Sequence, residues 1–331
     1  MKILLTGGAG YIGSYVAYLL NKLGYEVAIF DNLENGHKWA LKNNKFYFGD
    51  IRNFSQILEA LSDFRPDAIM HFAAYIKVEE STKSPYKYYE NNVIGSLNLI
   101  KAALMSNVRY FIFSSTAAVY GIPKQVPISE DSMCNPINPY GESKLMVEKI
   151  LKDIARSNFL KFGILRYFNV AGADIEAKLG QANKNPTHLI TRVLRAALGK
   201  IPYIEIFGTD YPTEDGTCVR DYIHIKDLAF AHIEVLNYIK KEDKSEIFNV
   251  GYGKGYSVKE IIKVAKKITK VDFPVKIGKR RPGDPPKLIA DPKKLLSLTN
   301  WEPKHNNIET IIKDAWEWEC YLNKNPILLE Y

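Results

Sequence analysis

The sequence has few of the features that mark secreted, metal-binding or membrane proteins. Its three cysteines, Cys134, Cys218 and Cys320, are scattered and show no Cys-x-x-Cys spacing, which favours a reducing compartment and argues against a disulfide framework or a zinc site. No run of about 18 apolar residues occurs, so we expect no membrane span. The first residues read as a strand and show no signal-peptide pattern. We therefore expect a cytoplasmic protein without a bound metal.

The charge distribution does not indicate a nucleic-acid partner, although the net charge is +8. Residues 259–294 contain 12 Lys and Arg against 4 Asp and Glu, so this one segment holds the whole excess. Its first lysines fit the solvated face of an amphipathic helix over 258–269. No recognition helix, zinc finger or aromatic-basic RNA motif is visible. The Lys-Arg-Arg cluster at 279–281 lies in a Pro/Gly-rich loop, where guanidinium groups suit a small phosphate-bearing ligand.

A glycine-rich turn stands almost at the start of the chain. Gly7, Gly10 and Gly13 are spaced G-x-x-G-x-x-G between a strand pattern at 2–6 and a helix pattern at 12–23. The first glycine allows a tight turn, the second lets backbone approach a pyrophosphate, and the third lets the helix pack on the strand. The N-terminus of such a helix also attracts an anion. This context predicts a bound dinucleotide.

An acidic residue ends the second strand pattern. The apolar run at 26–30 is followed by Asp31, which is placed to bind the adenosine ribose hydroxyls of a dinucleotide. A carboxylate at this point would repel a 2′-phosphate. The sequence therefore predicts NAD rather than NADP as the cofactor.

Strand and helix patterns alternate through residue 170, which predicts an α/β fold with a doubly wound parallel sheet of the Rossmann type. The expected strands are 2–6, 26–30, 46–48, 68–72, 110–113 and 162–165, and the later helices are 54–61, 85–105 and 140–157. Beyond residue 170 turns become frequent. We expect an NAD-binding domain over 1–170 and a smaller, loop-rich substrate-binding lobe over 171–331, from which 221–236 and 247–250 could return to the sheet.

One tyrosine and one lysine carry the expected chemistry. Tyr140 and Lys144 open a helix pattern soon after the strand end at 114–116, and a spacing of four places both side chains on one helix face. Because a free tyrosine has a pKa of about 10, a lysine ammonium and a cationic nicotinamide would favour the phenolate and lower that value. Tyr140 is therefore a candidate general base. Three other pairs share the spacing but not this context: Tyr18 with Lys22, Tyr120 with Lys124, and Tyr222 with Lys226.

These motifs together resemble the extended short-chain dehydrogenase/reductase family. Longer stretches are similar to the UDP-glucose 4-epimerases within it, and the similarity covers essentially the whole chain. The most specific stretch is 207–224, FGTDYPTEDGTCVRDYIH; the others are 6–13 (TGGAGYIG), 49–52 (GDIR), 71–74 (HFAA), 91–93 (NNV), 115–121 (STAAVYG) and 165–169 (LRYFN).

The resemblance implies a role for each matching residue. Tyr140, Lys144 and Thr116 would be catalytic. NAD would be held by Gly7, Gly10, Tyr11, Ile12, Gly13, Asp31, Asn32, Asp50, Ile51, Phe72, Ala73, Ala74, Asn91, Ser114, Lys144 and Phe168. The UDP-sugar would be held by Thr116, Tyr140, Asn169, His188, Leu189, Phe207, Arg220, Tyr222, Val258, Arg281, Asp284 and Leu288. For His188 and Tyr222, ordinary packing is an equally open interpretation. Family members often carry a lysine where this chain has Ile76.

The implied activity is the reversible inversion of carbon 4 in UDP-glucose and UDP-galactose, through a transient 4-keto sugar and enzyme-bound NADH, in a homodimer built by the helices near 86–105 and 140–157. Leu288 stands where enzymes restricted to these sugars tend to have tyrosine, so N-acetylated sugars become a hypothesis. A dehydratase is disfavoured because Ala117 and Ala118 follow Thr116 in place of an acidic pair. A UDP-sugar decarboxylase and a non-catalytic NAD-binding regulator remain alternatives.

Overall fold

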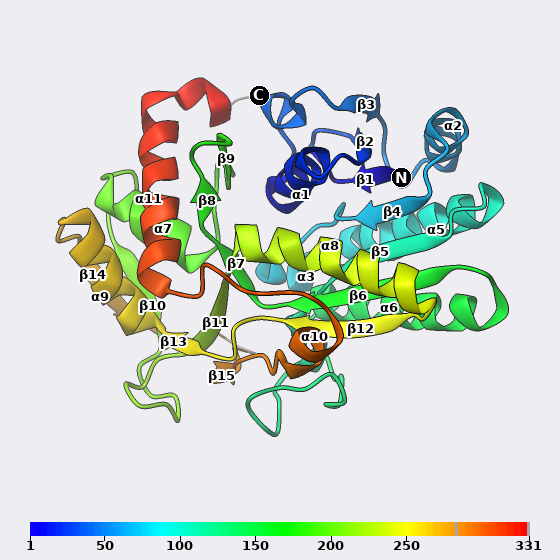
Figure 1. Cartoon of the computed structure of the whole chain (residues 1–331). Helices are drawn as coiled ribbons and strands as arrows, with labels where there is room; N and C mark the ends of the chain where they lie inside the picture. Colours follow the sequence, from blue (N-terminus) through cyan, green and yellow to red (C-terminus); the bar gives the residue numbers. More distant parts are fainter. Residues whose placement is uncertain (282–283, 330–331) are drawn as a thin grey trace.

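A seven-stranded parallel sheet forms the centre of the protein (Figure 1). The structure is a computed structural model that describes residues 1–281 and 284–329. The strand order is β12-β6-β5-β4-β1-β2-β3. From β1 the chain first adds β2 and β3 on one side and then β4 and later strands on the other, and ligands of such sheets bind at the point where the side changes. The predicted doubly wound sheet is confirmed. Its strands are β1 (Lys2–Thr6), β2 (Glu26–Asp31), β3 (Lys45–Phe48), β4 (Ala68–His71), β5 (Tyr110–Thr116), β6 (Lys161–Tyr167) and β12 (Glu246–Val250).

Helices cover both faces of this sheet because its strands are apolar on both sides. In β1, Ile3 and Leu5 pack into one core and Leu4 into the other. The first core also receives residues of α1 (Tyr11–Lys22) and α8 (Ile225–Glu242). The second receives residues of α2 (Phe54–Phe64), α5 (Gly95–Met105) and α6 (Pro139–Ser157). The polar ends of the strands are thereby left at one open edge.

The helix predicted over 85–105 is interrupted by a π-helical turn. It consists of α4 (Pro85–Tyr88), the π-helical segment η2 (Tyr89–Ile94) and α5. Such turns frequently occur at functional sites, and this one directs Asn91 and Asn92 into the interior. Three further short helices belong to this half of the chain: η1 (Lys38–Leu41), inside a segment predicted as a loop, α3 (Val78–Lys83) and η3 (Ala117–Tyr120).

The later part of the chain gathers beside the main sheet, on the left of Figure 1. It contains its own core of buried residues from α7, α9 and α11. Strand β12 and helix α8, however, return to the main sheet and its covering layer, as the sequence allowed. The remaining elements are β7 (Asn169–Ala171), β8 (Ala173–Asp174), β9 (Leu179–Gly180), α7 (Leu189–Ala197), β10 (Ile204–Phe207), β11 (Val219–His224), β13 (Gly255–Ser257), α9 (Val258–Thr269), β14 (Val275–Gly278), β15 (Lys287–Leu288), α10 (Lys293–Leu298), α11 (Ile308–Lys324) and η4 (Pro326–Leu329).

The surface agrees with the expected distribution of charge. Lys259, Lys263 and Lys267 are exposed along α9, as predicted for its solvated face. The three cysteines are free thiols. In the described part of the chain, no helix has the length and apolar character needed to cross a bilayer.

Candidate cofactor and catalytic site

The turn between β1 and α1 has the geometry of a phosphate cradle. Gly7 adopts φ +70°, and a Cβ there would lie 2.5 Å from the Ala73 backbone nitrogen. A Cβ on Gly13 would lie 2.4 Å from the Gly7 carbonyl oxygen, so neither position accepts a side chain. A Cβ on Gly10 would meet only that same carbonyl oxygen, at 3.3 Å. Gly10 lines an open cleft, so its missing side chain leaves backbone accessible to a ligand there.

This cleft lies where β1, β2 and β4 end. It has about 570 Å³ of space between its walls, part of it open to solvent. Of the predicted cofactor residues, the cleft brings together Gly7, Gly10, Asp31, Asn32, Ile51, Phe72, Ala73, Ala74 and Asn91. Ile12 and Gly13 lie in the first turn of α1 behind the cradle.

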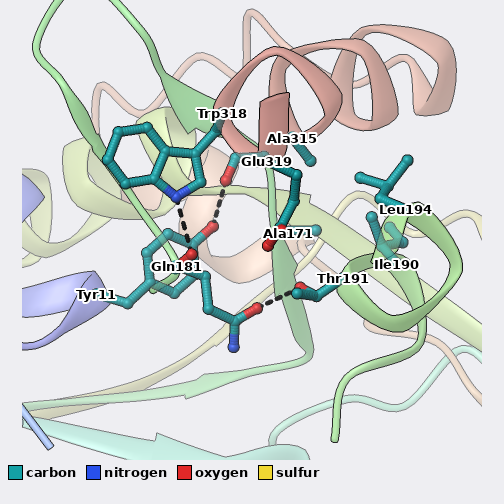
Figure 2. Close-up of a pocket in the computed structure, with 10 residues that line it drawn as sticks. Tyr11, Ala171, Gln181, Ile190, Thr191, Leu194, Ala315, Trp318 and Glu319 are labelled. Atoms are coloured by element: carbon teal, nitrogen blue, oxygen red, sulfur yellow. Dashed lines mark hydrogen bonds between the residues drawn. The ribbon is translucent and has the colours of Figure 1, made fainter. Parts of the chain in front are cut away.

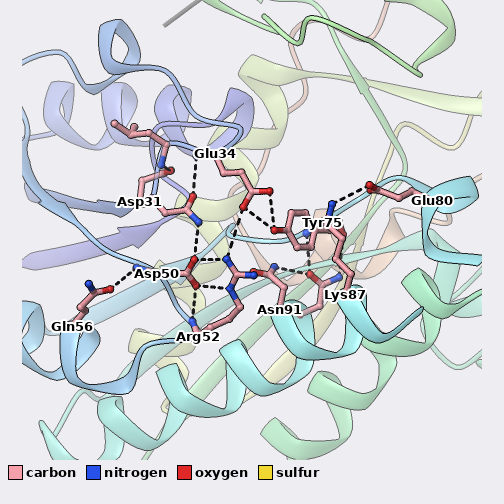
Figure 3. A network of polar contacts seen from close by, with 12 residues as sticks. Asp31, Glu34, Asp50, Arg52, Gln56, Tyr75, Glu80, Lys87 and Asn91 are labelled. Carbon is pink, nitrogen blue, oxygen red and sulfur yellow. Dashed lines mark hydrogen bonds and ion pairs between the residues drawn. The ribbon is translucent and has the colours of Figure 1, made fainter. Parts of the chain in front are cut away.

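The carboxylate of Asp31 is held in place by backbone. Its Oδ2 accepts from the Ala9 N–H at 3.0 Å and its Oδ1 from the Leu33 N–H at 2.8 Å. Burial raises the pKa of Asp31, and these two N–H donors oppose the rise. Asp50 stands beside it, where its Oδ2 accepts from Asn32 Nδ2 at 2.9 Å (Figure 3). The predicted ribose-binding acid and its neighbours thus form one polar wall of the cleft.

Thr116, Tyr140 and Lys144 meet at the adjacent strand ends. Thr116 ends β5, and Asn138 caps α6 by accepting from the Gly141 N–H at 2.9 Å, which places Tyr140 in the first helical turn. Tyr140 is 9% exposed and Lys144 is 4% exposed. The Lys144 ammonium donates to the Ser114 carbonyl oxygen at 2.9 Å. The structure therefore brings together the three residues that the sequence predicts to be catalytic.

Burial has the largest effect on the pKa of both Tyr140 and Lys144. It raises the pKa of Tyr140 to about 12, against a lowering by a hydrogen bond with Thr116. It also lowers the pKa of Lys144 to about 7, against an opposing effect of Glu148. The sequence-based expectation of a lowered Tyr140 pKa is therefore wrong for the protein groups alone, because desolvation of the phenolate outweighs the stabilisation that they provide. Of the two cations invoked, only Lys144 belongs to the chain.

The other tyrosine-lysine pairs of the same spacing have different surroundings. The Lys22 ammonium lies 4.6 Å from the centre of the Tyr18 ring on the first helix. Tyr222 belongs to β11, whereas Lys226 belongs to α8 and pairs with Asp174. Neither pair has Thr116 beside it.

The predicted substrate residues fall into small groups. Arg220 pairs with Asp284, with 3.2 Å between Nη2 and Oδ1, and it stands opposite Leu288 in the β11–β15 ladder. The Arg281 guanidinium lies 3.8 Å from the centre of the Phe207 ring. Thus the two arginines predicted to hold the UDP-sugar come from segments that also carry other predicted ligands.

Other contacts place the remaining predicted residues in the same part of the molecule. Asn169 and Tyr222 are partners in the β7–β11 ladder. Leu288 packs against an apolar cluster that contains Phe168 and Ala117. Val258 begins α9, and its N–H donates to the Cys218 carbonyl oxygen at 3.1 Å.

Tyr11, which does not line the cleft, lines a second, smaller cavity (Figure 2). The Tyr11 hydroxyl donates to the Gly172 carbonyl oxygen at 2.6 Å. His188 is the residue before Leu189, where α7 begins. Its Nδ1 lies 3.0 Å from Nε2 of Gln181, and Oε1 of Gln181 accepts from the Thr191 hydroxyl. Burial lowers the pKa of His188. Its contacts are those of a packed histidine, so its contact with substrate stays a prediction.

Comparisons with known proteins agree on one family. Residues 3–251 match the model of the "NAD dependent epimerase/dehydratase family". The chain belongs to this family. It is 48% identical to the UDP-glucose 4-epimerase of Lactobacillus helveticus over 96% of this chain and 97% of that protein. It superposes with a TM-score of 0.92 on the UDP-glucose 4-epimerase of Brucella ovis in complex with NAD, at 41% identity over 96% of this chain and 97% of the other. The UDP-Glc/GlcNAc 4-epimerase of Campylobacter jejuni gives 0.85 at 47% identity, over 97% and 99%.

The cleft of this epimerase/dehydratase-family chain contains residues that sequence reasoning did not find. Glu34 and Tyr75 line it, and Arg52 lies beside Asp50 (Figure 3). The two Arg52–Asp50 hydrogen bonds, at 2.9 and 2.6 Å, keep the pKa of Asp50 lowered to about 2. Glu34 and Tyr75 have a weak signal in the sequence because they lie in loops outside the quoted stretches, whereas Arg52 ends the stretch at 49–52 but has no predicted role. Ile76, in place of the lysine frequent in the family, is exposed.

Proposed function

We propose that this protein is a UDP-glucose 4-epimerase that keeps NAD bound throughout catalysis. The observation that carries the proposal is the meeting of Tyr140, Lys144 and Thr116 at strand ends beside a cleft that fits a dinucleotide. The full-length similarity to named UDP-glucose 4-epimerases supports the same activity. NAD is the cofactor because the family is NAD-dependent and because Asp31 faces the expected ribose position.

Three groups of residues would hold the three parts of NAD. The cradle of Gly7, Gly10 and Gly13 would take the pyrophosphate, with Tyr11 and Ile12 in the first turn of α1. The adenosine end would be held by Asp31, Asn32, Asp50 and Ile51. The nicotinamide end would be held by Phe72, Ala73, Ala74, Asn91, Ser114, Lys144 and Phe168. When bound, NAD supplies a reversible hydride acceptor for carbon 4 and a positive charge near Tyr140.

The side chains at the strand ends handle the proton. Tyr140 as phenolate accepts the proton of the 4-hydroxyl group, and Thr116 donates a hydrogen bond to the sugar oxygen. Lys144 stabilises the phenolate electrostatically. The 4-keto sugar rotates within the pocket, carbon 4 receives the hydride back on its other face, and Tyr140 returns the proton to the 4-oxygen. Because UDP does not react, most of the binding energy comes from contacts with UDP. The residues that make these contacts are Arg220, Arg281, Asp284, Asn169, Phe207, Tyr222, Leu189, Val258 and His188.

The decisive experiment is a product assay with the purified protein. We expect UDP-glucose and UDP-galactose to interconvert with no added NAD, and the protein to release NAD on acid denaturation. The Tyr140→Phe variant serves as the matched inactive control. A protein that contains NAD but leaves both UDP-sugars unchanged would contradict the proposal and favour a regulator. Release of carbon dioxide from a UDP-uronic acid would favour the decarboxylase.

N-acetylated UDP-sugars are proposed as further substrates. Leu288 is half-buried beside the cluster that contains Phe168 and Ala117, so a small side chain there leaves room near the sugar. The similar protein from Campylobacter jejuni is named as a UDP-Glc/GlcNAc 4-epimerase. Both observations favour a pocket that accepts an acetamido group.

The Leu288→Tyr variant tests this proposal. We expect its kcat/KM for UDP-N-acetylglucosamine to fall at least about tenfold, because the larger ring occupies the space of the acetamido group. Activity on UDP-glucose should stay within a few fold, and Leu288→Met, similar in volume, should resemble the wild type. Absence of wild-type turnover with UDP-N-acetylglucosamine, beside good turnover of UDP-glucose, refutes the substrate assignment.

The proposed assembly and cell compartment rest on less specific observations. A homodimer formed by the helices near 86–105 and 140–157 is supported by exposed apolar side chains on this stretch, Tyr86, Ile94, Leu97 and Met105. The cytoplasm is the proposed compartment because the cysteines are unpaired thiols. We also propose that residues 1–170 bind NAD and that 171–331 supply most of the substrate contacts. Neither a metal nor nucleic acid has a part in this activity.

A further inference from the structure

A hydrogen-bonded bridge joins the two walls of the cofactor cleft (Figure 3). The Tyr75 hydroxyl lies 2.9 Å from Oε1 and 2.7 Å from Oε2 of Glu34. Glu34 follows β2 and Tyr75 follows β4, and these two strands flank β1. Both residues line the cleft that contains Gly7 and Gly10. The bridge therefore passes from one side of the glycine turn to the other.

Each end of the bridge is anchored by further charged groups. Arg52, which already binds both oxygens of Asp50, approaches Glu34 with 3.9 Å between Nη2 and Oε2. At the other end, the Lys87 ammonium lies 4.3 Å from the centre of the Tyr75 ring. These contacts hold the two side chains in the positions in which they meet, and they balance the charge of Glu34.

The backbone of Tyr75 is fixed to the catalytic helix. Asn92, in the π-helical turn, accepts from the Tyr75 N–H at 2.9 Å and donates to its carbonyl oxygen at 3.0 Å. The same amide donates to the hydroxyl of Ser143 on α6 at 3.1 Å. Tyr75 and Tyr140 also belong to one buried aromatic cluster. The bridge is thus built into the framework of the site.

The chemistry of the bridge suits a contact that can open and close. Burial and the Glu34 carboxylate raise the pKa of Tyr75 to about 12, so its hydroxyl remains a hydrogen-bond donor across physiological pH. The carboxylate is 45% exposed, and exposed polar contacts of this kind contribute little to folding stability. The Tyr75–Glu34 contact can therefore break at little cost in stability, and both residues lie in loops that follow strands.

We propose that Glu34 and Tyr75 form a clasp that retains NAD in the cleft between catalytic cycles. The assignment rests on the proposed function, because a coenzyme that is reduced and reoxidised within one cycle works best when it does not leave. Release of NAD requires the Tyr75–Glu34 hydrogen bonds to break. Removal of either partner therefore accelerates release without removing any group from the chemistry at Tyr140.

The test measures NAD release from the purified holoenzyme. Wild type, Tyr75→Phe, Glu34→Ala and the double variant are diluted, passed through a desalting column at timed intervals, and assayed for NAD that remains after acid extraction. We expect release to be at least tenfold faster in each single variant and no faster in the double variant than in either one. Tyr47→Phe is the matched control, because Tyr47 donates to the Asp63 carboxylate at 2.5 Å outside the cleft.

Activity at saturating NAD provides the second readout. The Tyr75→Phe variant should lose epimerase activity on dilution and regain at least half of the wild-type kcat when NAD is added. Release within twofold of wild type in both single variants overturns the clasp, and so does a loss of activity that NAD does not restore. A further outcome separates the two proposals. If the wild-type protein holds NAD but converts no UDP-sugar, and the variants release NAD faster than it does, the clasp is supported and only the proposed function is contradicted.

Discussion

Replacement of Tyr140 by phenylalanine is expected to reduce kcat for epimerisation by about two to four orders of magnitude, the usual contribution of a general acid–base residue. Phenylalanine keeps the ring in its buried cluster with Tyr75 and Tyr88. It removes the hydroxyl that hydrogen-bonds with Thr116 and leaves no proton acceptor at that point. The measurement is steady-state turnover of UDP-glucose, with NAD content determined on the same sample.

The cofactor content distinguishes loss of chemistry from loss of the site. The Tyr140→Phe variant should contain as much NAD as the wild type, because the cradle and the Asp31 wall are untouched. Tyr47→Phe is a suitable control, since Tyr47 lies outside the cleft and donates to the Asp63 carboxylate. If Tyr140→Phe keeps more than a tenth of the wild-type kcat, another residue acts as the base. A variant without NAD would place Tyr140 in cofactor binding instead.

Much of the fold could be predicted because its signals are local. The turn at Gly7 requires a positive φ, and the apolar strand before it and the amphipathic helix after it define one βα unit. Repetition of such units through residue 170 indicates the parallel sheet, and the sheet places Asp31, Thr116 and Phe72 at one edge. Spacing alone then brings Lys144 to the same helix face as Tyr140.

The rest depends on contacts between distant segments. The pair of Arg220 with Asp284 joins residues 64 positions apart, and the bridge of Glu34 with Tyr75 joins residues 41 positions apart. Neither has a periodic signature. The pKa of Tyr140 in the protein alone could not be predicted either, because the pattern shows which charges are near but not how completely the phenol is removed from water.

A buried ion pair fixes the catalytic helix to the sheet. Arg166 on β6 is 2% exposed, and Glu148, one turn beyond Lys144 on α6, is fully buried. Arg166 Nε lies 3.0 Å from Oε1 of Glu148, and the Ser115 hydroxyl donates to the same oxygen at 2.5 Å. Arg166 also donates to the Tyr120 hydroxyl at 2.9 Å. The pair therefore links α6 to both β5 and β6 directly beneath the catalytic residues.

Replacement of Arg166 by methionine is expected to lower the free energy of unfolding by about 3–5 kcal/mol, because the carboxylate of Glu148 would remain buried without a cationic partner. Addition of Glu148→Leu should recover part of this loss, since no unpaired charge is then left in the core. The measurement is urea unfolding at one saturating NAD concentration, so that bound cofactor contributes equally to every variant.

Arg156→Met provides the comparison, because Arg156 pairs with Asp153 on the exposed side of the same helix and its loss should change stability little. An Arg166→Met protein as stable as Arg156→Met would show that the carboxylate is neutral or hydrated in the folded state. Recovery in the double variant, by contrast, would show that the unpaired charge and not the lost packing causes the damage.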